Sequence, residues 1–391
     1  MFKIKTYNAI SVKGLDRFSR DRYEVASEIG HPDAYVLRSH KLHGEDIPDT
    51  LLAVARAGAG VNNIPVEEYT KKGVVVFNTP GANANAVKEL VLAGLLLGSR
   101  GITQGMNYVE TLTNMTDAAE MSKLLEKEKK RFAGNELYGR TLGVVGLGAI
   151  GSMVAEMALA LGMKVVGFDP ALSVEAAWRL PSQVKRMENL QSLLSNADYV
   201  SLHVPALDAT RHMINRETLQ SAKEGLILLN FARDAIVDAD AVVDSLENGK
   251  LASYICDFPE PILLSRKDVI AMPHIGASTA EAEENCAVMA ADQVMEYLEN
   301  GNIKNAVNFP AVQMDRAPGD TTRITFSNDN VAGVLGHVLS VLADSDVNVI
   351  DMVNKSRGDV AYNIIDVENH PSEQVMDAIR DVEHVISVRV I

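Results

Sequence analysis

The sequence is poor in cysteine and in aromatic residues. Its 391 residues include two cysteines and one tryptophan, and aromatic residues make up 5% of the chain. Two cysteines cannot form a disulfide framework, so we interpret Cys256 and Cys286 as small buried hydrophobic residues in a reducing compartment. The sequence therefore predicts neither a catalytic thiol nor a metal site.

Basic residues and long hydrophobic runs are also scarce. The 37 Lys and Arg are outnumbered by 52 Asp and Glu, which gives a formal net charge of -15 and argues against nucleic-acid and membrane partners. The longest apolar run, "LVLAGLLLG", is about half a membrane span, and the N-terminus lacks a signal-peptide core. We expect a cytoplasmic globular protein of two or three domains, in which any anionic substrate must meet a local cluster of positive charge.

Two α/β series run along the chain. In the first hundred residues, apolar runs such as "AYVLRSH" and "VVVFNTP" alternate with helical patterns, which predicts parallel strands linked by helices. Residues 104–138 are more polar and are predicted as a helix leading into a loop. A second series, from "TLGVVGLG" to "GLILLNFAR", predicts a nucleotide-binding sheet. The helical pattern "TAEAEENCAVMAADQVMEYLENG" follows it.

The C-terminal part has a different pattern. Residues 306–322 have the Pro, Gly and polar content of a linker. Residues 323–391 then read as strand, helix, strand, strand, helix, strand. This order predicts a small ferredoxin-like βαββαβ module.

The stretch "VVGLGAIGSM" contains Gly146, Gly148 and Gly151 in the spacing G-x-G-x-x-G. An apolar strand precedes it and a helix follows, which is the context of a dinucleotide-binding loop. The next strand, "KVVGFD", ends at Asp169, and 169 minus 146 places this acid 23 residues after the first glycine. A carboxylate there accepts hydrogen bonds from ribose hydroxyls and repels a 2′-phosphate, so the sequence predicts NAD rather than NADP.

Further polar side chains follow strands of the second series. Arg233 lies in "NFARD", Asp257 and Glu260 lie in "CDFPEP", and His274 lies in "MPHIGAS". Oxidation of a 2-hydroxy acid needs a base for the hydroxyl proton, which a histidine supplies, and a cation for the carboxylate, which an arginine supplies. A nearby glutamate would stabilise the imidazolium. Taken separately, the arginine could cap a helix end, the glutamate could lie in a surface turn and the histidine could belong to the core. Together they favour hydride-transfer chemistry.

The chain resembles the D-isomer-specific 2-hydroxyacid dehydrogenases. The motifs "ARAGAGVNN", "VFNTPGANANAVKEL", "GRTLGVVGLGAIG", "GFDP", "SLHVP", "NFAR" and "PHIGAST" occur in the family's order over nearly the whole chain. The resemblance implies an α/β protein in which a Rossmann-type NAD domain is inserted into a flavodoxin-like α/β substrate domain, followed by a ferredoxin-like ACT domain. The implied segments are 1–95 for the substrate domain, 96–279 for the NAD domain, 280–312 for the returning substrate segment and 320–391 for the ACT domain.

The resemblance also assigns roles to residues. It makes Arg233, Glu260 and His274 the catalytic trio. The implied NAD site consists of Ala59, Gly146, Gly148, Ala149, Ile150, Gly151, Asp169, Val204, Phe231, Ala232, Asp257, Ile275, Gly276 and Ala277. The implied substrate site consists of Arg38, Ser39, Gly58, Gly60 and Asn62, with Arg38 and Ser39 at a phosphate. Lys129 or Lys130 would add a positive charge across a dimer interface, and a plain solvated helix face is the alternative for these lysines.

The implied reaction is NAD-dependent oxidation of D-3-phosphoglycerate to 3-phosphooxypyruvate, the first step toward serine. One alternative is a reductase for glyoxylate, hydroxypyruvate or another short 2-oxo acid. A remoter one, from a different class, is an NAD-sensing corepressor.

The C-terminal resemblance concerns regulation. Asn330 and Asn348 match asparagines that bind serine between paired ACT domains, and Asn328 stands where a histidine is expected. The resemblance thus implies L-serine as an effector and a homodimer or homotetramer. A purely structural dimerisation module is the alternative.

Overall fold

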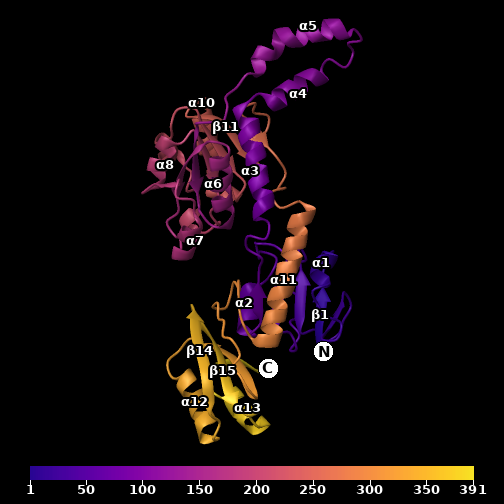
Figure 1. Cartoon of the computed structure of the whole chain (residues 1–391), viewed down its shortest axis with the longest axis vertical. Coiled ribbons are helices and arrows are strands. Elements are labelled where there is room, and N and C mark those ends of the chain that lie inside the picture. Colours follow the sequence, from indigo (N-terminus) through magenta and orange to yellow (C-terminus); the bar gives the residue numbers. More distant parts are fainter. The chain divides into compact units, whose positions relative to one another are not determined.

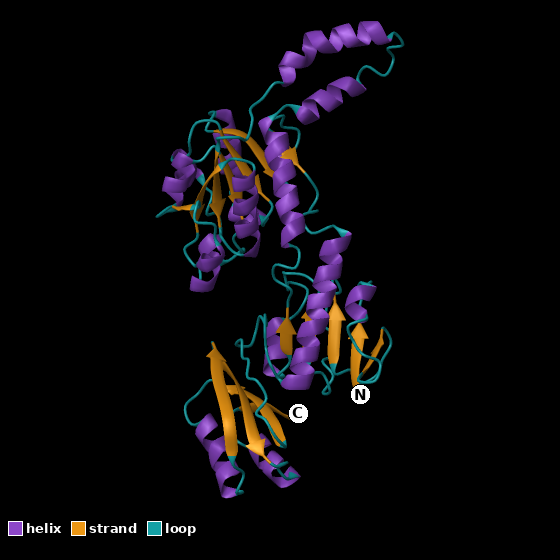
Figure 2. Cartoon of the chain, in the orientation of Figure 1, coloured by secondary structure: helices purple, strands orange, loops and turns teal.

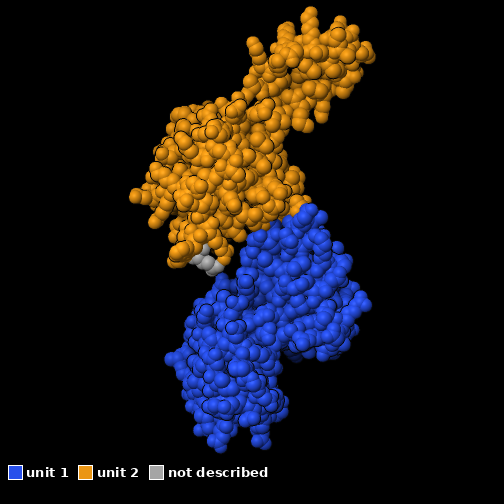
Figure 3. Space-filling model, in the orientation of Figure 1, with its two compact units in different colours: residues 1–83, 280–391 blue, residues 84–279 orange. Residues whose placement is uncertain are grey.

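The computed structural model describes residues 1–174 and 176–391, which form two compact units. Met1–Asn83 and Ala280–Ile391 make the first unit, and Ala84–Thr279 make the second (Figure 3). The first unit is therefore built from both ends of the chain, and the segment that contains the glycine loop is inserted between them.

A five-stranded parallel sheet lies at the centre of the first unit. Its order is β2-β1-β3-β4-β5, the flavodoxin-like arrangement. The strands are β1 (Phe2–Thr6), β2 (Tyr23–Ala26), β3 (Ala34–Leu37), β4 (Ala53–Arg56) and β5 (Val75–Phe77), and the helices are α1 (Val12–Leu15), α2 (Val66–Lys71) and α11 (Ala280–Asn300). Helix α11 packs beside α1 and buries Val294 and Leu298 in the same core as Ile4 of β1 (Figure 1). The returning helix is thus part of this core.

The segment predicted as a linker is packed into the core of the first unit. Phe309 and Val312 are fully buried, and single bridges join Ile303 to Val312 and Phe77 to Ala306. The segment therefore extends the core of the first unit, because its apolar residues pack against the strands and α11.

The second unit contains a seven-stranded parallel sheet. Its order, β12-β11-β10-β9-β6-β7-β8, is the Rossmann arrangement with one further strand beyond the six. The strands are β6 (Thr141–Val145), β7 (Lys164–Phe168), β8 (Lys185–Arg186), β9 (Tyr199–Leu202), β10 (Leu226–Asn230), β11 (Leu251–Cys256) and β12 (Val269–Ala271). The helices that follow them are α6 (Ala149–Ala160), α7 (Val174–Arg179), α8 (Leu190–Asn196), η2 (Asp208–Thr210), α9 (Arg216–Gln220), η3 (Asp234–Ile236), α10 (Ala239–Glu247) and η4 (Pro261–Leu263). The predicted α/β class with parallel sheets is confirmed.

Helix α3 (Ala84–Ser99) belongs to the second unit by its packing. Side chains of the seven-stranded sheet approach its glycines so closely that a Cβ on Gly98 would lie 2.8 Å from the Ile255 side chain. The boundary expected after residue 95 falls inside this helix. Although α3 carries the run "LVLAGLLLG", neither it nor any other helix in the described part of the chain is long and apolar enough to cross a membrane.

Two helices stand away from the sheet of the second unit. They are α4 (Ile102–Glu110) and α5 (Ala118–Glu128), followed by the short helix η1 (Lys129–Phe132) (Figure 1). Among their described residues, neither α4 nor α5 buries a side chain, and Met106 is 61% exposed. The sequence predicted one helix here, because the turn between the two carries no glycine or proline.

The C-terminal segment forms a βαββαβ module, with strand order β14-β15-β13-β16 and antiparallel pairing (Figure 2). Its elements are β13 (Thr321–Asp329), α12 (Val334–Asp344), β14 (Val349–Arg357), β15 (Val360–Glu368), α13 (Glu373–Arg380) and β16 (Val385–Val390). Gly333 begins α12 with a φ of 97°, a left-handed conformation that favours glycine. The predicted order of strands and helices is the observed one.

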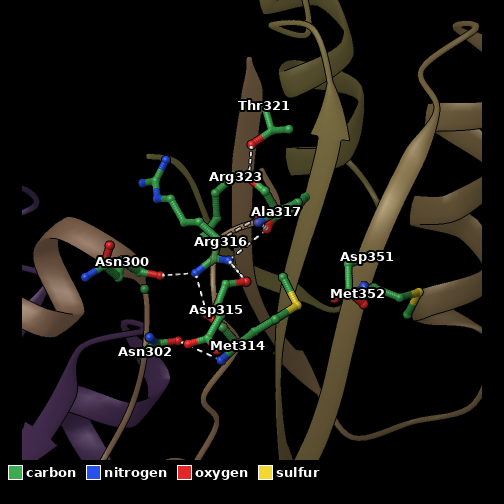
Figure 4. A network of polar contacts seen from close by, with 12 residues as sticks. Asn300, Asn302, Met314, Asp315, Arg316, Ala317, Thr321, Arg323, Asp351 and Met352 are labelled. Atoms are coloured by element: carbon green, nitrogen blue, oxygen red, sulfur yellow. Dashed lines mark hydrogen bonds and ion pairs between the residues drawn. The ribbon is translucent and has the colours of Figure 1, made fainter. Parts of the chain in front are cut away.

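A buried arginine joins this module to the end of α11 (Figure 4). Arg323 and Asp366 are each 1% exposed and pair through Nε–Oδ1 and Nη2–Oδ2 distances of 2.7 and 2.8 Å. The remaining guanidinium hydrogens are donated to the carbonyls of Asn300, Met314 and Asp315 at 2.9 to 3.0 Å. Every N–H direction of the guanidinium is therefore used, as a buried charge requires.

Candidate active site

The glycine loop forms a cradle at the start of α6. Gly146 has a φ of 88°, and a Cβ there would lie 2.7 Å from the backbone of His203. A Cβ on Gly151 would lie 1.9 Å from the carbonyl oxygen of Gly146, whereas one on Gly148 would meet nothing within 4 Å. Two glycines are therefore required by packing, and the third leaves open space at the N-terminus of a helix, where a pyrophosphate fits. Ala149 and Ile150 form the first turn of that helix.

Asp169 lies directly after β7 and holds the loop. Its Oδ2 accepts a hydrogen bond from the Leu147 amide at 2.8 Å, and its Oδ1 accepts one from the Ala171 amide at 2.9 Å. The hollow beside it is also lined by Trp178 and Arg186. A carboxylate oxygen has two acceptor positions, so Asp169 retains acceptor capacity for ribose hydroxyls.

Asp257 lies directly after β11, at the carboxyl edge of the sheet. Its Oδ2 accepts a hydrogen bond from the Gly276 amide at 3.2 Å, and its Oδ1 is buried without a partner among the described residues. Burial raises the pKa of this carboxyl, against the hydrogen bond from Gly276 and the charges of His274 and Arg233. A buried acceptor without a donor fits the amide of a nicotinamide ring, because such a group costs free energy until a donor reaches it.

The other residues expected at NAD follow the ends of strands. Val204 follows β9, Phe231 and Ala232 follow β10, and Ile275, Gly276 and Ala277 follow β12. The carboxyl ends of parallel strands form the edge at which such sheets bind ligands. Ala59 lies in the first unit, in the loop after β4. The donor groups, glycines and acids of the second unit thus fit NAD.

Arg233 and His274 converge on Phe258. The Arg233 guanidinium lies 5.8 Å from the centre of the Phe258 ring, and the His274 ring centre lies 4.4 Å from it. Asn230 donates its side-chain hydrogen bond to the Arg233 carbonyl at 2.9 Å and so fixes the backbone at the strand end. Sequence reasoning missed Phe258, although an aromatic residue directly after a strand end, in "CDFPEP", is a usable signal.

Glu260 forms no ion pair with His274. The histidine ion pairs in the described residues involve His40 and His384 only. Glu260 is exposed at the start of η4, and its charge acts on Tyr254 and Cys256. The structure thus brings together two members of the expected trio with Asp257, and leaves the third nearby.

The substrate residues expected in the first unit lie in two loops. Arg38 and Ser39 follow β3, and the Asn8 side chain accepts hydrogen bonds from the amides of Ser39 and His40 at 3.1 and 2.7 Å. Gly58, Gly60 and Asn62 lie in the loop after β4, where the Gly58 carbonyl accepts a hydrogen bond from the Thr79 amide. Asn62 offers its carbonyl oxygen to His43 at 3.1 Å.

Arg56 and Glu283 are two charged residues that sequence reasoning missed. Arg56 ends β4, and its Nε donates to the Arg38 carbonyl at 3.1 Å. A Cβ on Gly58 would lie 2.3 Å from the Arg56 guanidinium, so the glycine makes room for this side chain. Glu283 in the first turn of α11 pairs with Arg38 at 2.7 Å. Arg56 could have been found from the sequence, because it lies between an apolar strand and the glycine-rich "AGAG". No sequence pattern marks Glu283.

The three asparagines expected at an effector do not come together within one module. Asn328 is 4% exposed and accepts a hydrogen bond from the Asn363 side chain at 2.8 Å, so it belongs to the interior. Asn330 follows β13 and bonds to the Gly358 carbonyl, whereas Asn348 precedes β14 and lies at the opposite end of the sheet. A site that uses both exposed asparagines needs two modules side by side.

The lysines expected at a subunit interface lie in η1. Lys129 pairs with Glu126. Arg131 pairs with Glu128 at 2.7 Å and lies 5.5 Å from the centre of the Tyr108 ring. Two of the basic residues therefore form ion pairs within the α4–α5 hairpin, and Lys130 is exposed.

Comparisons with known proteins agree with this geometry. A family model described as "D-isomer specific 2-hydroxyacid dehydrogenase, NAD binding domain" matches residues 102–276. D-3-phosphoglycerate dehydrogenase from Methanocaldococcus jannaschii is 34% identical over 84% of this chain, which spans 61% of that relative's length. The same-named protein from Haemophilus influenzae is 32% identical over 87% of this chain and 81% of its own. An NAD+-bound 3-phosphoglycerate dehydrogenase from Entamoeba histolytica superposes with a TM-score of 0.60 at 25% identity, covering 78% of this chain and 98% of that one.

Proposed function

The chain belongs to the D-isomer-specific 2-hydroxyacid dehydrogenases, and we propose that it catalyses the NAD-dependent oxidation of D-3-phosphoglycerate to 3-phosphooxypyruvate. Two relatives that carry the name D-3-phosphoglycerate dehydrogenase match more than four fifths of the chain. The reverse reduction is the more convenient assay, because such alcohol oxidations usually favour the alcohol at equilibrium.

The reaction divides among residues of the second unit. NAD, when bound, supplies the acceptor for the C2 hydride. His274 takes the proton of the substrate hydroxyl, since an imidazole nitrogen is the most common general base in enzymes. Arg233 binds the carboxylate and stabilises the developing carbonyl through its fork of donors. Glu260 is assigned the role of stabilising the imidazolium on His274, which requires its exposed side chain to turn toward the ring when substrate binds.

This proposal rests on three side chains, Arg233, His274 and Asp257, at the carboxyl edge of the seven-stranded sheet. Arg233 and His274 share contact with Phe258 beside a buried Asp257 oxygen that has no partner among the described residues. A cation, a base and a carboxamide acceptor are the groups that hydride transfer to a nicotinamide ring requires. Arg38 and Arg56 in the first unit supply the local positive charge that a phosphorylated substrate needs in a chain of net charge -15.

The test is initial-rate NADH oxidation with 3-phosphooxypyruvate beside hydroxypyruvate on one preparation. We expect kcat/KM to favour the phosphorylated substrate by about a hundredfold, equivalent to about 2.7 kcal/mol of transition-state discrimination. Near equality would overturn the phosphoglycerate assignment and leave a general short-chain 2-oxo acid reductase. No turnover of either substrate would overturn the dehydrogenase reaction itself.

We further propose that the βαββαβ module is an ACT domain that binds L-serine between two copies of the chain. Asn330 and Asn348 lie at opposite ends of one module, so their joint use requires a pair of modules. The exposed α4–α5 hairpin offers a second surface for a homodimer or homotetramer. We expect millimolar L-serine to raise the melting temperature of an oligomer seen by sedimentation. A monomer whose melting temperature serine leaves unchanged would contradict both parts.

A further inference from the structure

Arg38, the cation expected to bind the substrate phosphate, is paired with the carboxylate of Glu283. Glu283 Oε1 lies 2.7 Å from Arg38 Nη1, and the two side chains are 44% and 41% exposed. Glu283 belongs to the first turn of α11, where the positive end of the helix dipole favours a carboxylate. The acid is therefore stable there whether or not Arg38 is available.

The backbone around Arg38 is held by contacts other than this ion pair. Arg56 and Asn63 donate hydrogen bonds to the Arg38 carbonyl at 3.1 and 3.4 Å, and Asn8 accepts from the amides that follow. Loss of the Glu283 charge would leave the loop in place. The ion pair therefore fixes the position of the Arg38 guanidinium and is not needed for the fold of the loop.

Arg38, Arg56 and Glu283 lie close to one another in the first unit, since Glu283 pairs with Arg38 and Arg56 donates to the Arg38 carbonyl. All three charges act on the thiol of Cys286, which lies one turn along α11 from Glu283 and whose pKa is raised chiefly by burial. The acid therefore sits within the cationic cluster that is proposed to receive the phosphate.

We propose that Glu283 is a specificity-determining residue that weakens binding of phosphorylated substrates. Its carboxylate holds the Arg38 guanidinium in the free protein and must share or release it when a phosphate binds. An unphosphorylated substrate places no charge on Arg38 and therefore does not compete with the acid for it. This inference rests on the proposed function, because it assumes that Arg38 meets the phosphate.

The neighbouring residue provides a matched control. Glu284 lies on the same helix and pairs with Lys13 at 2.6 Å, with side chains 31% and 67% exposed. Lys13 belongs to α1, whereas Arg38 and Gly58 lie in the loops after β3 and β4. Glu284→Gln removes the same charge from the same helix turn without touching the cationic cluster.

The experiment measures KM and kcat for 3-phosphooxypyruvate and hydroxypyruvate in the unchanged protein, Glu283→Gln and Glu284→Gln. We expect Glu283→Gln to lower KM for the phosphorylated substrate about fivefold with hydroxypyruvate unchanged, and Glu284→Gln to change neither by as much as twofold. Inorganic phosphate should inhibit hydroxypyruvate reduction at lower concentration in Glu283→Gln. An unchanged or higher KM for the phosphorylated substrate would overturn the proposal. Glu283→Ala serves as a second neutral variant if the glutamine protein folds poorly.

Failure of this inference is distinguishable from failure of the proposed function. The preference of the unchanged protein for the phosphorylated substrate tests the function alone. The change in that preference caused by Glu283→Gln tests the role of the acid. A strong preference that Glu283→Gln leaves unaltered overturns only the inference, whereas near equality in both proteins overturns the function and the inference together.

Discussion

Helix α11 meets an arginine–carboxylate pair at each end, and the two pairs differ in almost every physical respect. At its first turn, Glu283 and Arg38 share one contact and are nearly half exposed. At its last turn, Arg323 pairs with Asp366 through two hydrogen bonds, and both side chains are 1% exposed. The two distances of closest approach are equal at 2.7 Å, so distance alone does not separate them.

The difference lies in what else the arginines bind. Arg323 donates to three carbonyls, one of which belongs to Asn300 at the end of α11, and Asp366 also accepts a hydrogen bond from the Ala317 amide. Nearby carbonyls of the same helix end receive hydrogen bonds from Arg389 and Arg316. These cations match the negative end of the helix dipole. The buried pair is thus a fixed joint between helix and module, whereas the exposed pair leaves its cation available to a ligand.

Removing the cation of the buried pair is expected to have the largest effect. In Arg323→Met, Asp366 stays buried without its counter-ion, so we expect the module to lose about 3–5 kcal/mol of unfolding free energy at pH 7. Hydrogen exchange of β15 amides measures this loss locally, which suits a chain of several domains. Lys13→Met, which breaks an exposed pair, is the control. A loss below about 1 kcal/mol would show that the joint is not a major source of stability.

The loss of unfolding free energy in Arg323→Met should depend on pH, because Asp366 titrates differently with and without its arginine. Burial alone would raise the pKa of Asp366, but the hydrogen bonds from Arg323 and the Ala317 amide hold it below its usual range. The folded carboxyl of the unchanged protein therefore contributes stability above about pH 4 that is lost as pH falls through its lowered pKa. In Arg323→Met, burial is opposed mainly by the Ala317 amide, so the pKa of Asp366 rises and the dependence of stability on pH reverses. The two proteins should differ most at neutral pH and converge in acid.

Local patterns in the sequence predicted the strands and the glycine loop, because a strand end, a tight turn and a helix start lie within a few residues of one another. Gly146, Gly148 and Gly151 needed no distant information. The pairs at the two ends of α11 could not be predicted this way. Glu283 pairs with Arg38 in the loop after β3, and Arg323 pairs with a residue two strands further along the chain. The opposite placement of Asn330 and Asn348 likewise depends on strand direction in the folded sheet.

Removing the cation of the exposed pair is expected to have the smallest effect on stability. Arg38→Ala should change the unfolding free energy of the first unit by less than about 0.5 kcal/mol, since exposed ion pairs contribute little. The proposed role predicts instead that KM for 3-phosphooxypyruvate rises about tenfold, near 1.4 kcal/mol, while KM for hydroxypyruvate stays within twofold. Because Glu283 acts through Arg38 in this account, Glu283→Gln should lose most of its effect on KM in the Arg38→Ala background. Equal rises in KM for both substrates would assign Arg38 to the carboxylate instead, and an undiminished effect of Glu283→Gln would mean that the acid acts on the substrate directly.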